Sequence, residues 1–181
     1  FTPPVAARVC AYSNLAADEV LAKEGNHYPS LEGKIKDLSN IPSPAKPDKV
    51  DFPFASLIAM TNIGRELTFS ENTMDALIDS IKTLAKNTNM TTEMFDSSVS
   101  YGNQVARAIL AWSKKDNYGK TRGAKFSVTG LDGHWSPTPP GYFDAVEPKW
   151  ATIRTMALDS PNTFPIVPPP PFSKDSTSEF Y

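Results

Sequence analysis

The distribution of proline constrains the fold of this chain more than any other feature of its sequence. The 181 residues include 17 prolines, yet residues 54–136 contain none. The prolines lie at 3–4, at 29–53 and at 137–171. Inside a helix, proline removes a backbone donor and clashes with the preceding turn. The proline-free block is therefore predicted to be helical, and the proline-rich flanks to hold the connections.

Apolar residues recur at helical spacing through the first two thirds of the chain. The clearest stripe, at i, i+3, i+4 and i+7, is Met74, Leu77, Ile78, Ile81, Leu84 and Ala85. Residues that can cap helices precede these stretches: Thr2, Ser30, Ser70, and Thr91 or Thr92. We expect helices over 3–24, 30–39, 53–67, 71–87 and 92–115. Together they predict an all-α bundle spanning residues 1–117.

Residues 118–181 show no sustained helical period. They are predicted to be irregular, with short extended pieces and one or two helical turns within 143–157. Large apolar side chains alternate with prolines here: Trp135, Tyr142, Phe143, Trp150, Phe164, Phe172, Phe180 and Tyr181. Because such a segment becomes ordered only against a surface, we expect it to wrap onto the bundle or onto a further part of the protein. Trp135 and Trp150 are then mostly buried.

Charge, hydropathy and cysteine usage argue against several classes of protein. The net charge is −2 with no basic stripe, which argues against nucleic-acid binding. No run of 18 apolar residues predicts a transmembrane helix. The single cysteine, Cys10, rules out a disulfide within the chain. Its setting in an Ala/Val-rich helix predicts a buried small hydrophobe rather than a nucleophile.

The two histidines are the strongest candidates for catalysis or metal binding. His134 stands in the stretch "LDGHW" without an evident partner, so we interpret it as part of a turn rather than as a general base. His27 follows a helix end, where an imidazole is favourable. Two distant histidines and one cysteine do not make a zinc site. Motifs of the kinds GxSxG, GxxxxGK[ST] and GxGxxG are absent, so no catalytic, cofactor-binding or metal-binding residue is assigned.

The stretch "YGKTRGAK", residues 118–125, is the one compact basic segment. It is a candidate anion site, because glycines expose backbone N–H groups. We favour a different interpretation, a solvated loop that leaves the preceding helix.

Two blocks of the sequence resemble one known family. "FTPPVAARVCAYSNLAADEVL" is similar to the opening helix of bacterial vanadium-dependent haloperoxidase-like proteins, whose superfamily includes the type-2 phosphatidic acid phosphatases. "DGHWSPTPPGYFDAVEPKWATIRTMALDS" resembles their mid-chain segment, and a "PPPPFS" run follows it. The blocks occur in the family's order and span nearly the whole chain. The resemblance implies an all-α fold of two helical bundles, of which this chain is the N-terminal one.

The resemblance places the family's anion site in the C-terminal bundle. Its motifs are a Lys and an Arg before Pro, a Pro-Ser-Gly-His segment, and a later Arg and His. Such side chains clamp the oxygens of vanadate or of a phosphoryl group. None of the motifs matches here: Arg-Pro does not occur, Leu131-Asp132 precedes Gly133-His134, and neither Arg107 nor Arg154 is followed by a histidine. Vanadate is thus implied for the full-length protein, with none bound by this chain alone, which we expect to be inactive.

The resemblance also implies a partner, the C-terminal half of the same protein, joined covalently or present as a second chain. Residues 118–181 would lead to it. Export to the periplasm is expected from the family's usual location. The sequence leaves open whether the enzyme is a haloperoxidase or a phosphatase. It is also compatible with a secreted helical module whose aromatic tail contacts a glycan or a protein, and with a family member that kept the fold and lost the chemistry.

Overall fold

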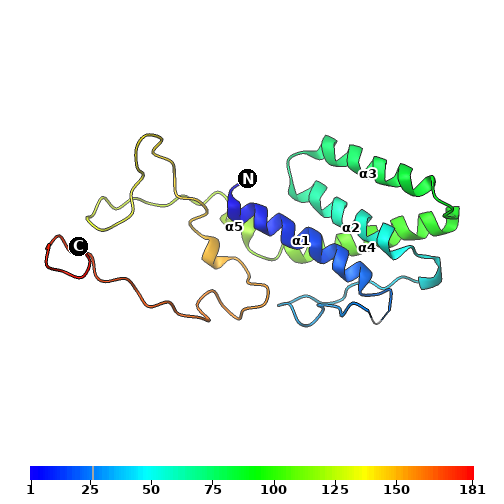
Figure 1. Cartoon of the computed structure of the whole chain (residues 1–181), viewed down its shortest axis with the longest axis horizontal. Coiled ribbons are helices and arrows are strands. Elements are labelled where there is room, and N and C mark those ends of the chain that lie inside the picture. The colour runs from blue at the N-terminus through cyan, green and yellow to red at the C-terminus, as the bar shows by residue number, and fades with distance from the viewer. Residues whose placement is uncertain (26) are drawn as a thin grey trace.

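The computed structural model describes residues 1–25 and 27–181, and every regular element in these ranges is helical (Figure 1). The long helices are α1 (Pro3–Leu21), α2 (Phe52–Leu67), α3 (Glu71–Lys86) and α4 (Thr92–Ser113). The short ones are η1 (Pro47–Lys49), α5 (Tyr118–Thr121) and η2 (Trp150–Thr152). The expected all-α class is confirmed. Within these ranges no helix has the length and apolar character needed to cross a bilayer.

Four of the five expected helices form close to their predicted bounds. Local capping explains two of the starts, because the side chains of Asp51 and Thr91 accept a backbone N–H from the first turns of α2 and α4. Helix α1 begins at Pro3-Pro4, where a missing N–H leaves no donor unsatisfied. The side chains of Thr2 and Ser70 make no capping bond, although both stand at N-cap positions.

Helix α1 is shorter than expected at its C-terminal end. It stops at Leu21, before the predicted stop signal Gly25-Asn26. Asn26 itself lies outside the described residues.

Helix α2 packs against α1, α3 and α4 and so forms the centre of the bundle (Figure 1). The core that these helices share includes Tyr12, Leu15, Val20, Phe52, Ile63, Tyr101, Val105, Ile109 and Trp112. Gly102 of α4 lies directly on α2, since a Cβ atom there would be 2.5 Å from the carbonyl oxygen of Ala55. The backbones of α2 and α4 therefore approach as closely as only glycine allows.

The predicted helix over residues 30–39 is wrong. The segment forms turns, and Gly33 adopts the left-handed conformation at φ 74°, which interrupts a right-handed helix. Its start is held by Glu19 of α1, whose buried carboxylate accepts from the Ser30 hydroxyl and the Leu31 N–H, both at 2.7 Å. Ser30 thus bonds to a neighbouring helix instead of capping a helix of its own.

After α5 the chain leaves the bundle along an irregular path, which we call the tail (residues 122–181; Figure 1). The part of the tail around η2 returns to the helices. The side chain of Asn117 donates to the carbonyl of Thr152 at 3.2 Å, and the N–H of Lys36 donates to the carbonyl of Met156 at 2.9 Å. Helix η2 is the short helical turn expected within 143–157.

Most large apolar side chains of the tail remain exposed. More than half of each side chain is exposed at Leu131, Tyr142, Phe143, Val146, Phe164, Ile166, Val167 and Tyr181. Trp135 is 47% exposed and packs edge-on against Phe126 rather than on a helix, so the prediction that it is mostly buried is wrong. Trp150 is half-buried beside Tyr118. The bundle therefore covers little of the tail beyond the part around η2.

Candidate functional site at the junction of bundle and tail

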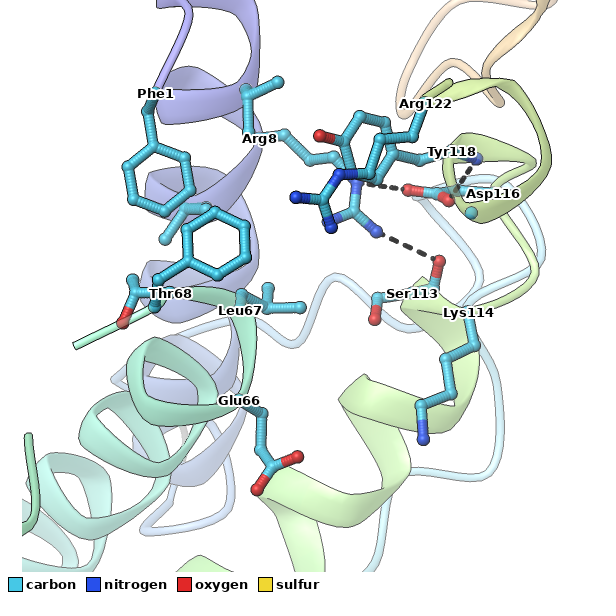
Figure 2. Close-up of a pocket in the computed structure, with 14 residues that line it drawn as sticks. Phe1, Arg8, Glu66, Leu67, Thr68, Ser113, Lys114, Asp116, Tyr118 and Arg122 are labelled. Carbon is cyan, nitrogen blue, oxygen red and sulfur yellow. Dashed lines mark hydrogen bonds and ion pairs between the residues drawn. The ribbon is translucent and has the colours of Figure 1, made fainter. Parts of the chain in front are cut away.

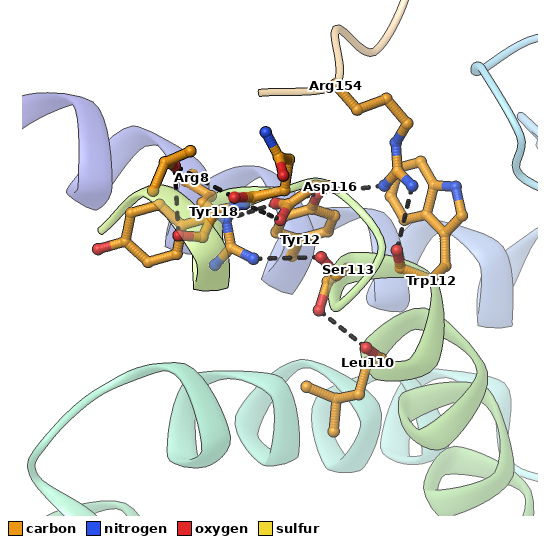
Figure 3. Close-up of polar contacts among 10 residues, drawn as sticks. Arg8, Tyr12, Leu110, Trp112, Ser113, Asp116, Tyr118 and Arg154 are labelled. Carbon is orange, nitrogen blue, oxygen red and sulfur yellow. Dashed lines mark hydrogen bonds and ion pairs between the residues drawn. The ribbon is translucent and has the colours of Figure 1, made fainter. Parts of the chain in front are cut away.

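A buried carboxylate marks the point where the chain leaves the bundle. Asp116 follows α4, and its side chain is 1% exposed. Its Oδ2 accepts from Arg8 Nε at 2.6 Å and from the Tyr12 hydroxyl at 2.8 Å, and its Oδ1 accepts from the Tyr118 N–H at 2.9 Å (Figure 3). A buried charge is tolerated when it is paired and hydrogen-bonded in this way.

The guanidinium of Arg8 is fixed from several sides. The side chain is only 9% exposed, and Nη2 donates to the Ser113 carbonyl at 3.4 Å. The guanidinium carbon lies 4.8 Å from the ring centroid of Tyr12 and 4.5 Å from that of Tyr118, both within the range of cation–π attraction. Arg8 therefore ties the first turns of α1 to the end of α4.

Arg154 brings the tail into the same cluster. Its backbone N–H donates to the Asp116 carbonyl at 2.9 Å. Its side chain donates to the Trp112 carbonyl at 3.1 Å and to the Tyr12 hydroxyl at 3.3 Å, and its guanidinium lies 3.9 Å from the Trp112 ring centroid (Figure 3). We call Arg8, Tyr12, Asp116 and Arg154 the junction cluster. Through it, contacts run continuously from α1 and α4 to the tail.

The junction cluster keeps the Tyr12 phenol protonated. Burial raises the pKa of Tyr12 above the ordinary phenol value of about 10, and the charge of Asp116 and its hydrogen bond raise it further, against a smaller opposite effect of Arg154 and Arg8. Burial, followed by the charge of Glu19, also raises the pKa of Tyr101. In the folded state both phenols therefore resist ionisation.

We expect alkaline pH to unfold the chain as these two phenols ionise. A pKa raised by folding contributes stability that is complete below the unfolded pKa of about 10 and is lost as pH rises above that value. Exposed Tyr28, Tyr142 and Tyr181 should ionise first, and Tyr12 and Tyr101 only together with loss of helical circular dichroism. Phenolate absorbance recorded in the same titration checks this. Ionisation of all the phenols before any loss of helix would contradict it.

A pocket of about 320 Å³ opens beside the junction cluster (Figure 2). It lies among the start of α1, the ends of α2 and α4, and α5. Phe1 and Leu67 line it together with Arg8 of α1, whose guanidinium reaches toward Asp116, and with Lys114 and Arg122 (Figure 2). The pocket therefore brings apolar and cationic side chains together.

Both histidines lie away from the pocket and the junction cluster. His134 is exposed, and its Nδ1 lies 3.0 Å from the hydroxyl of Thr129 within the same loop, which agrees with the predicted turn. His27 is also exposed and lies beyond Leu21, the last residue of α1. The field of a helix end falls off within the last turn, so the expected role of His27 at the helix end is wrong.

The prediction that Cys10 is buried is wrong, because Cys10 is exposed on α1.

The stretch 118–125 is partly ordered, because Tyr118–Thr121 form the helical turn α5. Arg122 then places its guanidinium 4.9 Å from the ring centroid of Phe69. Part of the predicted solvated loop therefore packs against the bundle.

Sequence reasoning did not identify the junction cluster. Arg8 and Tyr12 lie one helical turn apart on α1, but Asp116 and Arg154 come from distant segments. One signal was present: Arg8 lies on the face of α1 that also carries buried Val5 and Tyr12. A charge on an apolar face implies a buried partner. Spacing alone does not reveal that Asp116 is this partner.

The two arginines of the junction cluster already have oxygen partners. An oxyanion such as vanadate needs several free cationic donors at one point, and the family resemblance adds an imidazole. Arg8 and Arg154 already pair with carboxylate, carbonyl and phenol oxygens. Across residues 1–25 and 27–181, no hydrogen bond joins a histidine to either arginine, and no group of three or more His, Cys, Asp or Glu could hold a metal ion.

Comparison with known proteins identifies a similar solved structure. No protein-family model matches the sequence, and no curated protein matches it either. The structure is similar to one described as the crystal structure of the first bacterial vanadium-dependent iodoperoxidase, with a TM-score of 0.93 and 40% sequence identity. The match covers 100% of this chain and 44% of that chain. The chain therefore spans less than half the length of that protein, and the irregular tail is part of the match.

Proposed function

Because the chain belongs to the vanadium haloperoxidase superfamily, we propose that it is the N-terminal scaffold half of a vanadium-dependent haloperoxidase-like enzyme. The vanadate site then lies in a C-terminal half, on the same polypeptide or on a second chain. This chain alone binds no vanadate and has no peroxidase activity. Its role is to bury one face of the catalytic half and to hold it in place, in a protein exported to the periplasm.

The exposed apolar surface of the tail is the observation that carries this proposal. Ile166 and Val167 are 91% and 87% exposed, and they stand among further exposed rings. Apolar surface of this extent marks an interaction site. The similar iodoperoxidase has a counterpart for the whole tail, yet 56% of its length has none here, since 44% is matched. A further part of this kind would offer a surface to cover the exposed side chains of the tail.

The composition of the exposed surface favours a protein partner over a glycan. A glycan platform uses the flat faces of aromatic rings. The two most exposed large side chains of the tail are instead the β-branched aliphatics Ile166 and Val167, which offer no ring face to a sugar. We therefore propose the catalytic half, rather than a carbohydrate, as the partner of the tail.

Intact mass tests the proposal directly. The protein that contains this chain would be purified from its source under native conditions, denatured and weighed. We expect either a longer polypeptide or a second polypeptide of similar or larger size, and iodide oxidation that depends on added vanadate. A single species at the 19.8 kDa of this chain would overturn the proposal. Hydrolysis of a phosphate ester without peroxidase activity would overturn the haloperoxidase assignment.

A matched pair of substitutions tests the role of the tail in holding the catalytic half. Ile166→Asp should leave the free energy of unfolding of chain 1–181 within about 0.5 kcal/mol of the original, because the side chain is 91% exposed. It should weaken binding of the catalytic half by tenfold or more, on the order of a hot-spot residue. The control Leu84→Asp makes the same change at a 68% exposed position of α3. Equal effects of the two variants on binding would contradict the assignment.

A further inference from the structure

We infer that the pocket between α1, α2, α4 and α5 binds a small amphipathic organic anion, a carboxylate attached to an aromatic or aliphatic body. The inference rests on the pocket's own residues and does not depend on the proposed function. The pocket volume of about 320 Å³ lies at the lower end of the range of small-molecule sites.

Arg8 supplies a donor group that is already oriented at the floor of this pocket. Its side chain is 9% exposed, and it is held by Asp116, by the Ser113 carbonyl and by two aromatic rings. A guanidinium carries five N–H donors, and the described contacts use one on Nε and one on Nη2. These contacts hold the guanidinium in place beside the pocket, and Nη1 has no hydrogen-bond partner among the described residues. A donor fixed in advance costs little entropy when an anion binds.

Two further cationic side chains line the rim without a carboxylate partner. Among the described residues, no ion pair or hydrogen bond joins Lys114 or Arg122 to an acidic side chain. Two carboxylates also line the pocket: Asp116 pairs with Arg8, and Glu66 shares Arg65 with Glu71 and Asp75. With three cationic and two acidic side chains, the lining carries a small net positive charge.

Apolar side chains of the same pocket supply a surface for the body of the ligand. It is formed by Phe1, Val5, Val9, Leu67 and Phe69. The rings of Phe1 and Phe69 stack with centroids 5.4 Å apart, and Arg122 lies over Phe69. An anion head at the cationic side chains thus has apolar side chains beside it for an attached ring or chain. Inorganic anions lack this second contact, so the pocket favours an organic anion.

The experiment measures binding of 2-naphthoate to chain 1–181 by isothermal titration calorimetry. The uncharged isostere 2-naphthamide and inorganic phosphate serve as comparison ligands. Lys114→Gln and Arg122→Gln remove the rim charges, and Lys115→Gln is the matched control, since Lys115 is exposed next to Lys114 but does not line the pocket. All three positions are exposed, so folding should be unaffected.

We expect 2-naphthoate to bind, and 2-naphthamide and phosphate to bind at least roughly tenfold more weakly, the scale of a charge-assisted hydrogen bond. Arg122→Gln and Lys114→Gln should each weaken naphthoate several-fold, and together about tenfold or more, whereas Lys115→Gln should not. Equal binding of naphthoate and naphthamide would overturn the inference, because the exposed tail would then be the binding surface. Equal loss in the control variant, or no binding at all, would also overturn it.

Discussion

Replacing Asp116 with alanine is expected to lower the free energy of unfolding of chain 1–181 by about 3–5 kcal/mol, the range for removing one partner of a buried ion pair. The carboxylate accepts from Arg8, Tyr12 and the Tyr118 N–H while it is 1% exposed. Its removal leaves the Arg8 guanidinium buried without its counter-charge and the Tyr12 hydroxyl without an acceptor. Denaturation by urea, followed by far-ultraviolet circular dichroism, measures the loss.

Two comparisons separate this effect from a general cost of substitution. Asp132→Ala removes a carboxylate that pairs with Lys174 on the surface, where the side chain is 70% exposed, and should cost less than about 1 kcal/mol. The double variant Arg8→Met with Asp116→Leu should be less destabilised than the sum of its single changes, because neither buried charge is left alone. A loss for Asp116→Ala no larger than that for Asp132→Ala would contradict the assigned role.

Replacing Gly102 with valine should cost about 3 kcal/mol of unfolding free energy, the upper part of the range for overpacked cores. A Cβ atom at this position lies 2.5 Å from the Ala55 carbonyl oxygen and 3.0 Å from the Cβ of Ile58. The nearest clashing atom belongs to the backbone, so the clash can be relieved only if α2 and α4 move apart. Because protein cores are close-packed, that separation also loosens the neighbouring contacts of both helices.

Gly119→Val is the matched control for this prediction. A Cβ atom at Gly119 meets nothing within 4 Å, so the same substitution there should change the free energy of unfolding by less than about 1 kcal/mol. Urea midpoints report the stability, and near-ultraviolet circular dichroism reports the packing of Tyr101 and Trp112. Equal stability of the two variants would show that α2 and α4 do not touch at Gly102.

The helices of the bundle could be predicted from the sequence because their signals are local. The stripe from Met74 to Ala85 and the proline-free block identify α3 and α4 without knowledge of any distant contact. The sequence of residues 30–39 carried an equally local helix signal, yet these residues do not form a helix. There the carboxylate of Glu19, on α1, accepts hydrogen bonds from the hydroxyl of Ser30 and the N–H of Leu31. A tertiary hydrogen bond overrode a weak helical preference.

The candidate site could not be predicted, because its geometry depends on contacts between distant segments. Arg8 meets Asp116, and Tyr12 meets Arg154, across most of the chain. The family resemblance came from sequence, and the structural match supports it. The sequence predicted that the tail packs against a surface. It did not show whether that surface is the bundle of this chain or a further part of the protein. The exposure of Ile166 and Val167 shows that the bundle is not that surface for them.

The hydrogen bond from the Arg154 N–H to the Asp116 carbonyl joins the two ends of residues 117–153 at the bundle. The entropy lost in closing such a loop rises only slowly with its length. Insertions and deletions at the exposed tip of this loop, near Leu131, therefore leave the starting point of the following segment unchanged. The loop can vary in length at this tip without displacing its two anchors on the bundle.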